Sequence, residues 1–345
     1  MIATSTRIMA IWALLVALVT SMLVAAGVGA VELDWVKIAG LIAERSGLYE
    51  AEASLVERSV FWVIRAPRIL LAILVGGALG LSGAALQGIF RNPLADPGLI
   101  GVSSGAALCV VGAIVFGATL SLPVSPWFIP LAAFIGAILA TMCVLKLATQ
   151  GSRIDVATML LAGIAINALA GAFIGFATYI ADDAQLRSLT MWSLGSLGGA
   201  GWREVGLIAL FTLPGAAVIL RQRRALDLLL LGEREAGHLG IDVTRTRRAI
   251  IAACALMVGV GVGFTGIIGF VGLVVPHLLR LAGGAAHRWV LPGSLLGGAI
   301  LLLAADTLAR TVAAPAELPI GVLTSLVGAP FFLALLLGQR RRALA

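Results

Sequence analysis

Long apolar runs separated by short polar turns dominate this sequence and constrain its fold. After Arg65 and Arg68 come an eighteen-residue apolar run, a polar segment from Gln87 to Gly98, and a second apolar run. A run of that length is a candidate membrane span. Two prolines and a closing glycine favour a turn in the polar segment. We therefore expect two membrane helices joined by a tight polar loop, with the two arginines at the opposite mouth.

Composition supports a membrane location for the whole chain. The 345 residues are 60% hydrophobic and 12% charged, with a mean hydropathy of +1.08, whereas soluble domains carry about 25% charged residues. The 42 glycines predict close packing between helices, because small residues let helix backbones approach in lipid. Cys109, Cys143 and Cys254 lie inside apolar runs and are expected to be small buried side chains, without a metal or disulfide.

The runs predict an all-α membrane protein with one domain over residues 1–345 and ten spans. The first span is longer than the apolar core of a secretory signal, so we expect it to be retained. The eighth is short and follows the seventh almost directly, which predicts irregular backbone around Gly266–Gly272, sheltered by protein. The expected spans are residues 8–30, 67–90, 98–118, 126–148, 156–179, 204–220, 248–267, 269–283, 291–310 and 318–338.

Charge sets the expected orientation. If both termini are cytoplasmic, two thirds of the 24 Lys and Arg residues fall in inner segments and most of the 17 acidic residues fall outside. Cytoplasmic loops favour basic residues, so this orientation is preferred. The formal charge of +7 therefore reflects topology and does not indicate a nucleic-acid partner.

A short internal sequence similarity predicts two inverted repeats. Gly80-Leu-Ser-Gly83 is followed by Pro93, and Gly263-Phe-Thr-Gly266 is followed at the same distance by Pro276. Many transporters contain such inverted halves. The repeats would cover about residues 67–179 and 248–338, with a cytoplasmic loop at 221–248 before the second.

The chain carries no recognisable energy source or catalytic set. It has no phosphate-binding Gly-x-x-x-x-Gly-Lys-Ser/Thr loop. Asp306 and Arg310 are four residues apart and can pair on one helix face. An ion-coupled carrier would need a titratable group in mid-membrane, and a membrane enzyme would need clustered catalytic groups. We therefore favour a passive conduit, driven by a separate subunit, over the ion-coupled carrier and the membrane enzyme.

The longest inner loop, residues 221–248, is rich in arginine. Its apolar residues predict two short amphipathic helices joined at a glycine, with two glutamates suited to the dipole of the second. The loop either docks a cytoplasmic engine or lies on the membrane surface. The docking interpretation rests on Leu231, Gly232, Glu233, Glu235, Ala236, Leu239 and Gly240.

Several motifs occur in the order found in one known family. They are Arg65-x-Pro-Arg68, Gln87-x-x-Phe-x-Asn92-Pro93-Leu94-Ala95-x-Pro97, Gly269-Phe-x-Gly-Leu-x-x-Pro-His277, His287-Arg288, Leu291-Pro-Gly293, Asp306-x-x-Ala-Arg310 and Glu317-Leu-Pro-x-Gly321. From the second span onward the chain resembles the FecCD-like permease subunits of iron–siderophore, haem and vitamin B12 ABC importers.

The resemblance implies a type II ABC importer permease in the bacterial inner membrane. It implies a homodimer, two cytoplasmic ATPase subunits docked on residues 228–242, and a periplasmic substrate-binding protein. ATP and Mg²⁺ would bind the ATPases, and this chain would hold no cofactor. Binding-protein docking would fall on Arg65, Arg68 and Arg310, where outward-facing arginines can steer acidic partners. Interfacial snorkelling or a local pair such as Asp306–Arg310 is the alternative.

The resemblance also places an inner gate at Asn92, Leu94, Val156 and Ala157. The vitamin B12 permease pattern has small hydroxyl residues at the last two positions, where this chain has Val156 and Ala157. An apolar constriction can still close by dewetting.

Cargo is expected to be haem or a related iron chelate. The segment from Val274 to His277 resembles haem and cobalamin permeases, and the segment from Ala184 to Ser196 resembles haem permeases. Cobalamin and ferric siderophores remain alternatives. We expect His277 and His287 to make structural hydrogen bonds instead of binding cargo.

Overall fold

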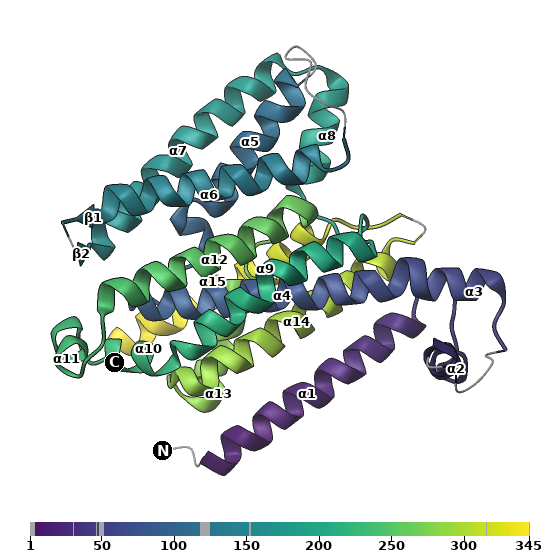
Figure 1. Ribbon diagram of the computed structural model, residues 1–345, viewed down its shortest axis with the longest axis horizontal. Coiled ribbons are helices and arrows are strands. Elements are labelled where there is room, and N and C mark those ends of the chain that lie inside the picture. Colours follow the sequence, from purple (N-terminus) through teal and green to yellow (C-terminus); the bar gives the residue numbers. More distant parts are fainter. Residues whose placement is uncertain are drawn as a thin grey trace.

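The computed structural model describes residues 4–29, 31–45, 47, 52–117, 125–151, 153–314 and 316–344. Helices form almost every element of the described chain (Figure 1). The exception in these ranges is a small antiparallel hairpin, β1 (Thr149–Gln150) and β2 (Arg153–Ile154). The expected all-α class is therefore confirmed. The predicted ends of the first and third spans, residues 30 and 118, lie outside the described residues.

Seven of the described helices are long and apolar enough to cross a membrane. One of them is continuous through α3, a π-helical segment η1, and α4. The bounds are α1 (Thr4–Gly27), α3 (Leu55–Ser59), η1 (Val60–Arg65), α4 (Ala66–Phe90), α6 (Phe128–Ala148), α7 (Val156–Ile180), α9 (Trp202–Arg221), α12 (Val243–Thr265) and α14 (His287–Val312).

Shorter apolar helices occupy the remaining expected positions. They are α5 (Val102–Phe116), which follows the 3-10 turn η2 (Pro97–Ile100), α13 (Val271–Gly283), and the apolar part of α15 (Ile320–Leu344). Each of the ten predicted spans thus coincides with an apolar helix. That these three also cross the membrane stays a prediction.

The predicted end of the second span at residue 90 is confirmed, whereas its start at residue 67 and the start of the polar turn at Gln87 were wrong. The helix that contains α4 begins at Leu55 instead of residue 67, because Ser54 and Glu57 form a reciprocal capping box. At the other end, Gln87 belongs to the helix and not to the turn, and its amide donates to the Gly272 carbonyl at 3.1 Å. The turn begins at Arg91, which has a left-handed φ of 49°.

Two of the loops that were expected outside the membrane contain helices that the sequence analysis did not predict. These are α2 (Trp35–Arg45) and α8 (Asp183–Ser193). A second capping box begins α8, where Asp182 and Gln185 exchange hydrogen bonds with each other's backbone. Each helix is only 11 residues long, too short to appear as an apolar span.

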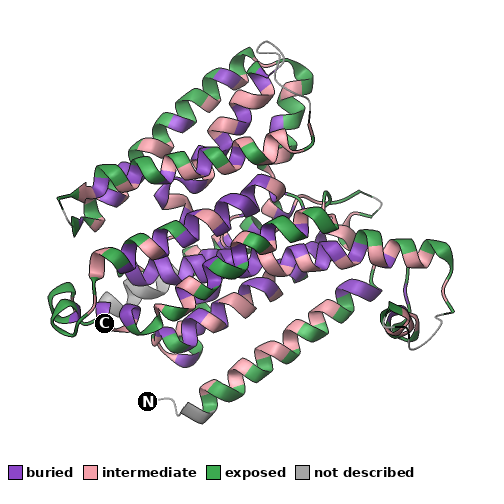
Figure 2. Ribbon diagram, viewed as in Figure 1, coloured by how far each residue is buried: buried purple, intermediate pink, exposed green. Residues whose placement is uncertain are grey.

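Helix α4 lies at the centre of the molecule and is buried along nearly its whole length (Figure 2). Glycines explain this position, as predicted from composition. A Cβ atom added at Gly80 would overlap the carbonyl oxygen of Ser294 on α14, and one added at Gly83 would overlap that of Gly272 on α13. Backbone therefore packs directly on backbone, which maximises dispersion contacts where lipid offers no hydrophobic drive.

The helices gather around α4 in recognisable groups (Figure 1). One group, α5 to α8, lies to one side of the group formed by α4, α9, α12 and α14, and α1 lies on the other side. The short helices α10 (Arg223–Leu229) and α11 (Glu233–His238) lie at one end with the hairpin, the start of α1 and the end of α15. Helices α2 and α3 lie at the opposite end. We call these the inner and outer ends.

Irregular backbone separates α12 from α13, as predicted. Gly266 and Phe270 both adopt left-handed φ angles, 69° and 67°. Another part of the chain satisfies a carbonyl group at the end of α12, since Ser196 N–H donates to the buried Thr265 carbonyl at 2.8 Å. Protein thus shelters this break within the bundle.

The two similar glycine motifs, Gly80–Gly83 and Gly263–Gly266, have different local structures. Gly80 and Gly83 lie in the middle of α4, whereas Gly263 lies near the end of α12 and Gly266 caps it. The inverted-repeat relation between the two halves stays a prediction.

Candidate functional site

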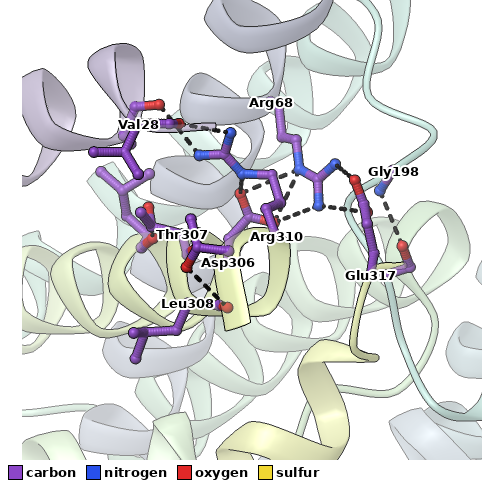
Figure 3. Close-up of polar contacts among 12 residues, drawn as sticks. Val28, Arg68, Gly198, Asp306, Thr307, Leu308, Arg310 and Glu317 are labelled. Atoms are coloured by element: carbon purple, nitrogen blue, oxygen red, sulfur yellow. Dashed lines mark hydrogen bonds and ion pairs between the residues drawn. The ribbon is translucent and has the colours of Figure 1, made fainter. Parts of the chain in front are cut away.

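A cluster of charged side chains lies toward the outer end of the bundle (Figure 3). Arg65 and Arg68 come from the η1–α4 helix, Asp306 and Arg310 from α14, and Glu317 from the loop before α15. We call these five residues the outer charged network. The stretch from Arg68 to Phe90 rises about 33 Å at 1.5 Å per residue, so this network lies a membrane thickness away from the turn after α4.

Arg68 is the hub of the outer charged network. Its Nη1 and Nη2 atoms donate to the two carboxylate oxygens of Glu317, each at 2.9 Å. Its Nε atom donates to both oxygens of Asp306, at 2.9 and 3.1 Å. Only 6% of Arg68 is exposed. The planar guanidinium group is thus saturated by two carboxylates, the geometry for which arginine is best suited.

Arg65 and Arg310 fasten the end of α1 to the bundle. The last carbonyl groups of a helix lack intrahelical partners and carry partial negative charge. Arg65 Nη1 donates to Ala26 O at 2.5 Å and Gly27 O at 3.1 Å. Arg310 Nη2 donates to Ala25 O at 3.2 Å. These arginines therefore cap the C-terminal end of α1 from two neighbouring helices.

The predicted local pair is confirmed, and a second pair was missed. Arg310 Nε lies 3.3 Å from Asp306 Oδ2, at the expected spacing of four residues. Glu317 belonged to a quoted motif, but its pairing with Arg68 spans 249 residues. No local pattern reveals a contact at that separation.

Docking of a binding protein on Arg65, Arg68 and Arg310 stays a prediction. The contacts that the structure shows for these arginines are made within the chain itself. Arg65 is 3% exposed, while the Glu317 side chain is 46% exposed. Hydrogen bonds from Arg68 hold the pKa of Glu317 below its usual value, so this carboxylate stays charged at neutral pH. The network contains three guanidinium groups and two carboxylates, so it carries excess positive charge.

At the inner end, α10 and α11 form the two short helices predicted for the loop. Gly232 joins them with a φ of 140°, a conformation that suits glycine. Glu233 and Glu235 lie in the first turn of α11. The predicted apolar face is divided, since Ala236 is fully buried whereas Leu231 and Leu239 are 66% and 58% exposed. We call residues 223–240, which contain α10, α11 and the glycines Gly232 and Gly240, the coupling loop.

Two polar contacts anchor the coupling loop to the membrane helices. Glu233 Oε1 accepts from Arg247 Nη2 on α12 at 2.6 Å, and this bond lowers the pKa of Glu233. Asp227 on α10 accepts from the backbone N–H of His287 at 2.6 Å and lies 3.0 Å from its Nδ1. Burial opposes ionisation of Asp227, but the bonds from His287 outweigh it and lower its pKa.

The two histidines considered as cargo ligands have protein contacts. His287 is buried in the first turn of α14, where it binds Asp227. The His277 ring packs edge-on against Phe331, with centroids 6.1 Å apart. Across the described residues, no three His, Cys, Asp or Glu side chains lie close enough to hold a metal ion.

The predicted gate residues lie at the inner end. Asn92 Oδ1 accepts from the Leu94 N–H at 2.9 Å and so fixes the turn after α4. Val156 and Ala157 begin α7, half-buried and exposed respectively, directly after the hairpin. Whether these four residues close a pathway depends on a second copy of the chain, so the gate stays a prediction.

Comparison with known proteins identifies a matching family and several similar permeases. A model of the FecCD transport family matches residues 13–338. The hemin transport system permease protein HmuU of Yersinia pestis is 51% identical over 279 residues, covering 81% of this chain and 83% of that protein. The vitamin B12 import system permease protein BtuC of Escherichia coli is 44% identical over 280 residues, covering 81% and 84%.

A solved structure has the same overall fold. It is described as an inward-facing conformation of an ABC transporter assigned to the metal-chelate type. Its TM-score to this chain is 0.83 at 32% sequence identity, over 95% of this chain and 98% of that one.

Proposed function

Because this chain belongs to the FecCD transport family, whose members are multi-pass permease subunits of ABC importers, we propose that it conducts haem or a related iron chelate across the bacterial inner membrane. The observation that carries the cargo proposal is the 51% identity to a hemin permease over most of both chains. Haem is the cargo here, and the chain itself needs no cofactor.

Cobalamin is the second candidate cargo. Vitamin B12 permeases reach 44% identity over a similar share of the chain. A pathway that passes a large ligand without holding it needs few polar contacts, so its walls do not distinguish the two cargoes.

The energy would come from two ATPase subunits at the inner end. Leu231 and Leu239 project from the coupling loop and offer them an apolar contact. The bonds of Glu233 to Arg247 and of Asp227 to His287 connect this loop to α12 and α14. Both of those helices pack against α4. Movement of the ATPases would therefore be transmitted to the centre of the bundle instead of being lost in a flexible loop.

A second copy of the chain would complete the pathway. Helix α7 exposes large apolar side chains along much of its length, and its first turn carries two predicted gate residues. These side chains are Leu161, Ile164, Leu169, Phe173, Phe176 and Tyr179. A homodimer formed about α7 would bring two sets of Asn92, Leu94, Val156 and Ala157 together at the inner end.

A periplasmic binding protein would dock at the outer end. The excess positive charge of the outer charged network supports an acidic partner surface. Because Arg68 already holds Asp306 and Glu317, an incoming carboxylate would have to compete with both. The docking residues are thus proposed to be Arg65, Arg68 and Arg310, with Glu317 as the group that is displaced.

The cargo proposal is tested in proteoliposomes that contain the chain with its ATPase subunit and binding protein. We expect the binding protein loaded with haem to stimulate ATP hydrolysis and haem uptake. Cobalamin and a ferric siderophore serve as matched cargoes. Uptake of cobalamin in preference to haem would overturn the cargo proposal and leave the permease assignment intact.

A further inference from the structure

A groove of about 380 Å³ lies at the inner end, between the start of α1 and the starts of α10 and α14. It can accommodate about a dozen water-sized volumes, enough for a polar head group. The residues that line this basic groove are Arg7, Ile8, Ile11, Arg223, Arg288 and Trp289.

Positive charge in the basic groove is not neutralised by its lining. Three arginines from three helices converge there, and none of the six lining residues is acidic. Arg7 is held in place because its Nε donates to the Gly283 carbonyl at 3.0 Å. Arg223 and Arg288 make no hydrogen bond or ion pair within the described ranges. The positive charge of Arg288 helps to lower the pKa of Asp227, but the Asp227 carboxylate is hydrogen-bonded to His287 and does not pair with Arg288.

The rest of the groove is apolar. Ile8 and Ile11 come from the first turns of α1, and the buried ring of Trp289 comes from α14. The indole N–H of Trp289 already donates to the Leu279 carbonyl at 3.0 Å, so the ring offers hydrocarbon to the groove. A cationic rim beside an apolar wall suits a molecule with an anionic head and a hydrocarbon tail better than a free anion.

The groove lies where such a molecule would be found. The apolar run of α1 begins at Ile8, directly after Arg7, so Arg7 marks a membrane surface. Along most of its length α1 is poorly buried (Figure 2). From these contacts we propose that the basic groove binds the head group of an anionic phospholipid, which bridges the start of α1 to α10 and α14. The orientation of the chain decides only which leaflet supplies the lipid.

The test uses the full chain, stripped of lipid in detergent. Phosphatidylglycerol or phosphatidylcholine with the same acyl chains is titrated in, and bound lipids are counted by native mass spectrometry. The test variant carries Arg7→Gln, Arg223→Gln and Arg288→Gln. The control carries Arg221→Gln, Arg245→Gln and Arg248→Gln, which removes the same charge from the same end of the bundle.

We expect a single tight phosphatidylglycerol that phosphatidylcholine does not replace. The test variant should bind it roughly 100-fold more weakly, about fivefold for each arginine, whereas the control should keep its affinity. The corresponding Arg→Lys triple variant keeps the charges and should retain most of the binding, which separates charge loss from misfolding. Equal losses in test and control variants would overturn the proposal. Displacement of the lipid by a comparable concentration of inorganic phosphate would also overturn it.

Discussion

At the scale of single residues, the outer charged network shows how a few buried charges fix several helices. Arg68 lies between Asp306 and Glu317, and Arg65 and Arg310 cap the end of α1. Because these groups are buried, each contact matters strongly for stability. A buried charge that loses its partner destabilises the fold by about 3–5 kcal/mol. A partner on the surface matters far less. The two carboxylates of the network should therefore differ in their effects on stability.

The substitution Asp306→Asn should destabilise the protein strongly. Asp306 is 1% exposed and is shared by Arg68 and Arg310, so its loss leaves Arg310 without a carboxylate partner and Arg68 with Glu317 alone. We expect a loss of about 3 kcal/mol or more, seen as a lower thermal unfolding midpoint in detergent. Glu317→Gln is the matched control and should cost about 1 kcal/mol or less, because Glu317 is half-exposed. Equal effects would show that burial does not govern the network.

Glycines at the centre of the bundle define a second residue-scale requirement. Gly80→Val should destabilise the packing of α4 on α14, because the added atoms overlap the Ser294 backbone. Overpacking of this kind costs about 1–3 kcal/mol. Gly112→Val on α5 is the control, since an added Cβ there meets nothing within 4 Å. Equal unfolding midpoints for the two variants would contradict the packing account.

Local sequence patterns predicted these residues only in part. The Asp306–Arg310 pair was predictable because four residues separate its members on one helix. The break at Gly266–Gly272 was also predictable, because the eighth apolar run is short and follows the seventh almost directly. Arg68 with Glu317 was not, because only the tertiary fold brings them together. The capping box at Ser54 and Glu57 was readable in the sequence and would have corrected the start of the helix that contains α4.

At the scale of elements, the coupling loop is attached to the bundle through both of its short helices. Two short helices meet at Gly232, and polar contacts attach each of them to a long helix. The sequence predicted the two helices and their junction. It did not predict that Ala236 faces inward while Leu231 and Leu239 face outward, because helices this short carry too few residues to define a face.

Gly232→Ala should uncouple the loop. Its φ of 140° and ψ of 152° lie in a region that only glycine occupies readily, so alanine costs about 1–3 kcal/mol there. We expect the junction to change its conformation and so relieve this strain. The bundle then keeps its unfolding midpoint, while the loaded binding protein no longer stimulates ATP hydrolysis in proteoliposomes. Gly237→Ala is the control, because Gly237 is helical and an added Cβ meets nothing within 4 Å. Normal stimulation in the Gly232 variant would show that the junction geometry is not needed.

At the scale of the whole molecule, the proposed sites divide between the two ends of the bundle. The coupling loop, the predicted gate and the basic groove share the inner end, and the outer charged network lies toward the outer end, as the places of α10, α11 and the end of α1 in Figure 1 indicate. The order of spans and the motifs predicted this division. The sequence could not show which arginines are enclosed, because enclosure depends on how α1, α4 and α14 pack.

Orientation is tested with single cysteines on a background without Cys109, Cys143 and Cys254. A cysteine placed at Glu235 should react with a membrane-impermeant reagent only after cells are opened, because α11 is expected in the cytoplasm. A cysteine placed at Asp183 on α8 should react in cells whose outer membrane alone is permeable. The reverse pattern would place the coupling loop outside and remove the basis for ATPase docking.

The central claim is that this chain is a conduit whose driving force comes from separate subunits. The most direct measurement is ATP-dependent haem uptake into proteoliposomes that hold the purified chain with or without its ATPase partner. The account predicts no ATP hydrolysis and no uptake by the chain alone, and both when the partner is added. Hydrolysis of ATP by the chain alone, or uptake that follows a proton gradient without ATP, would contradict it.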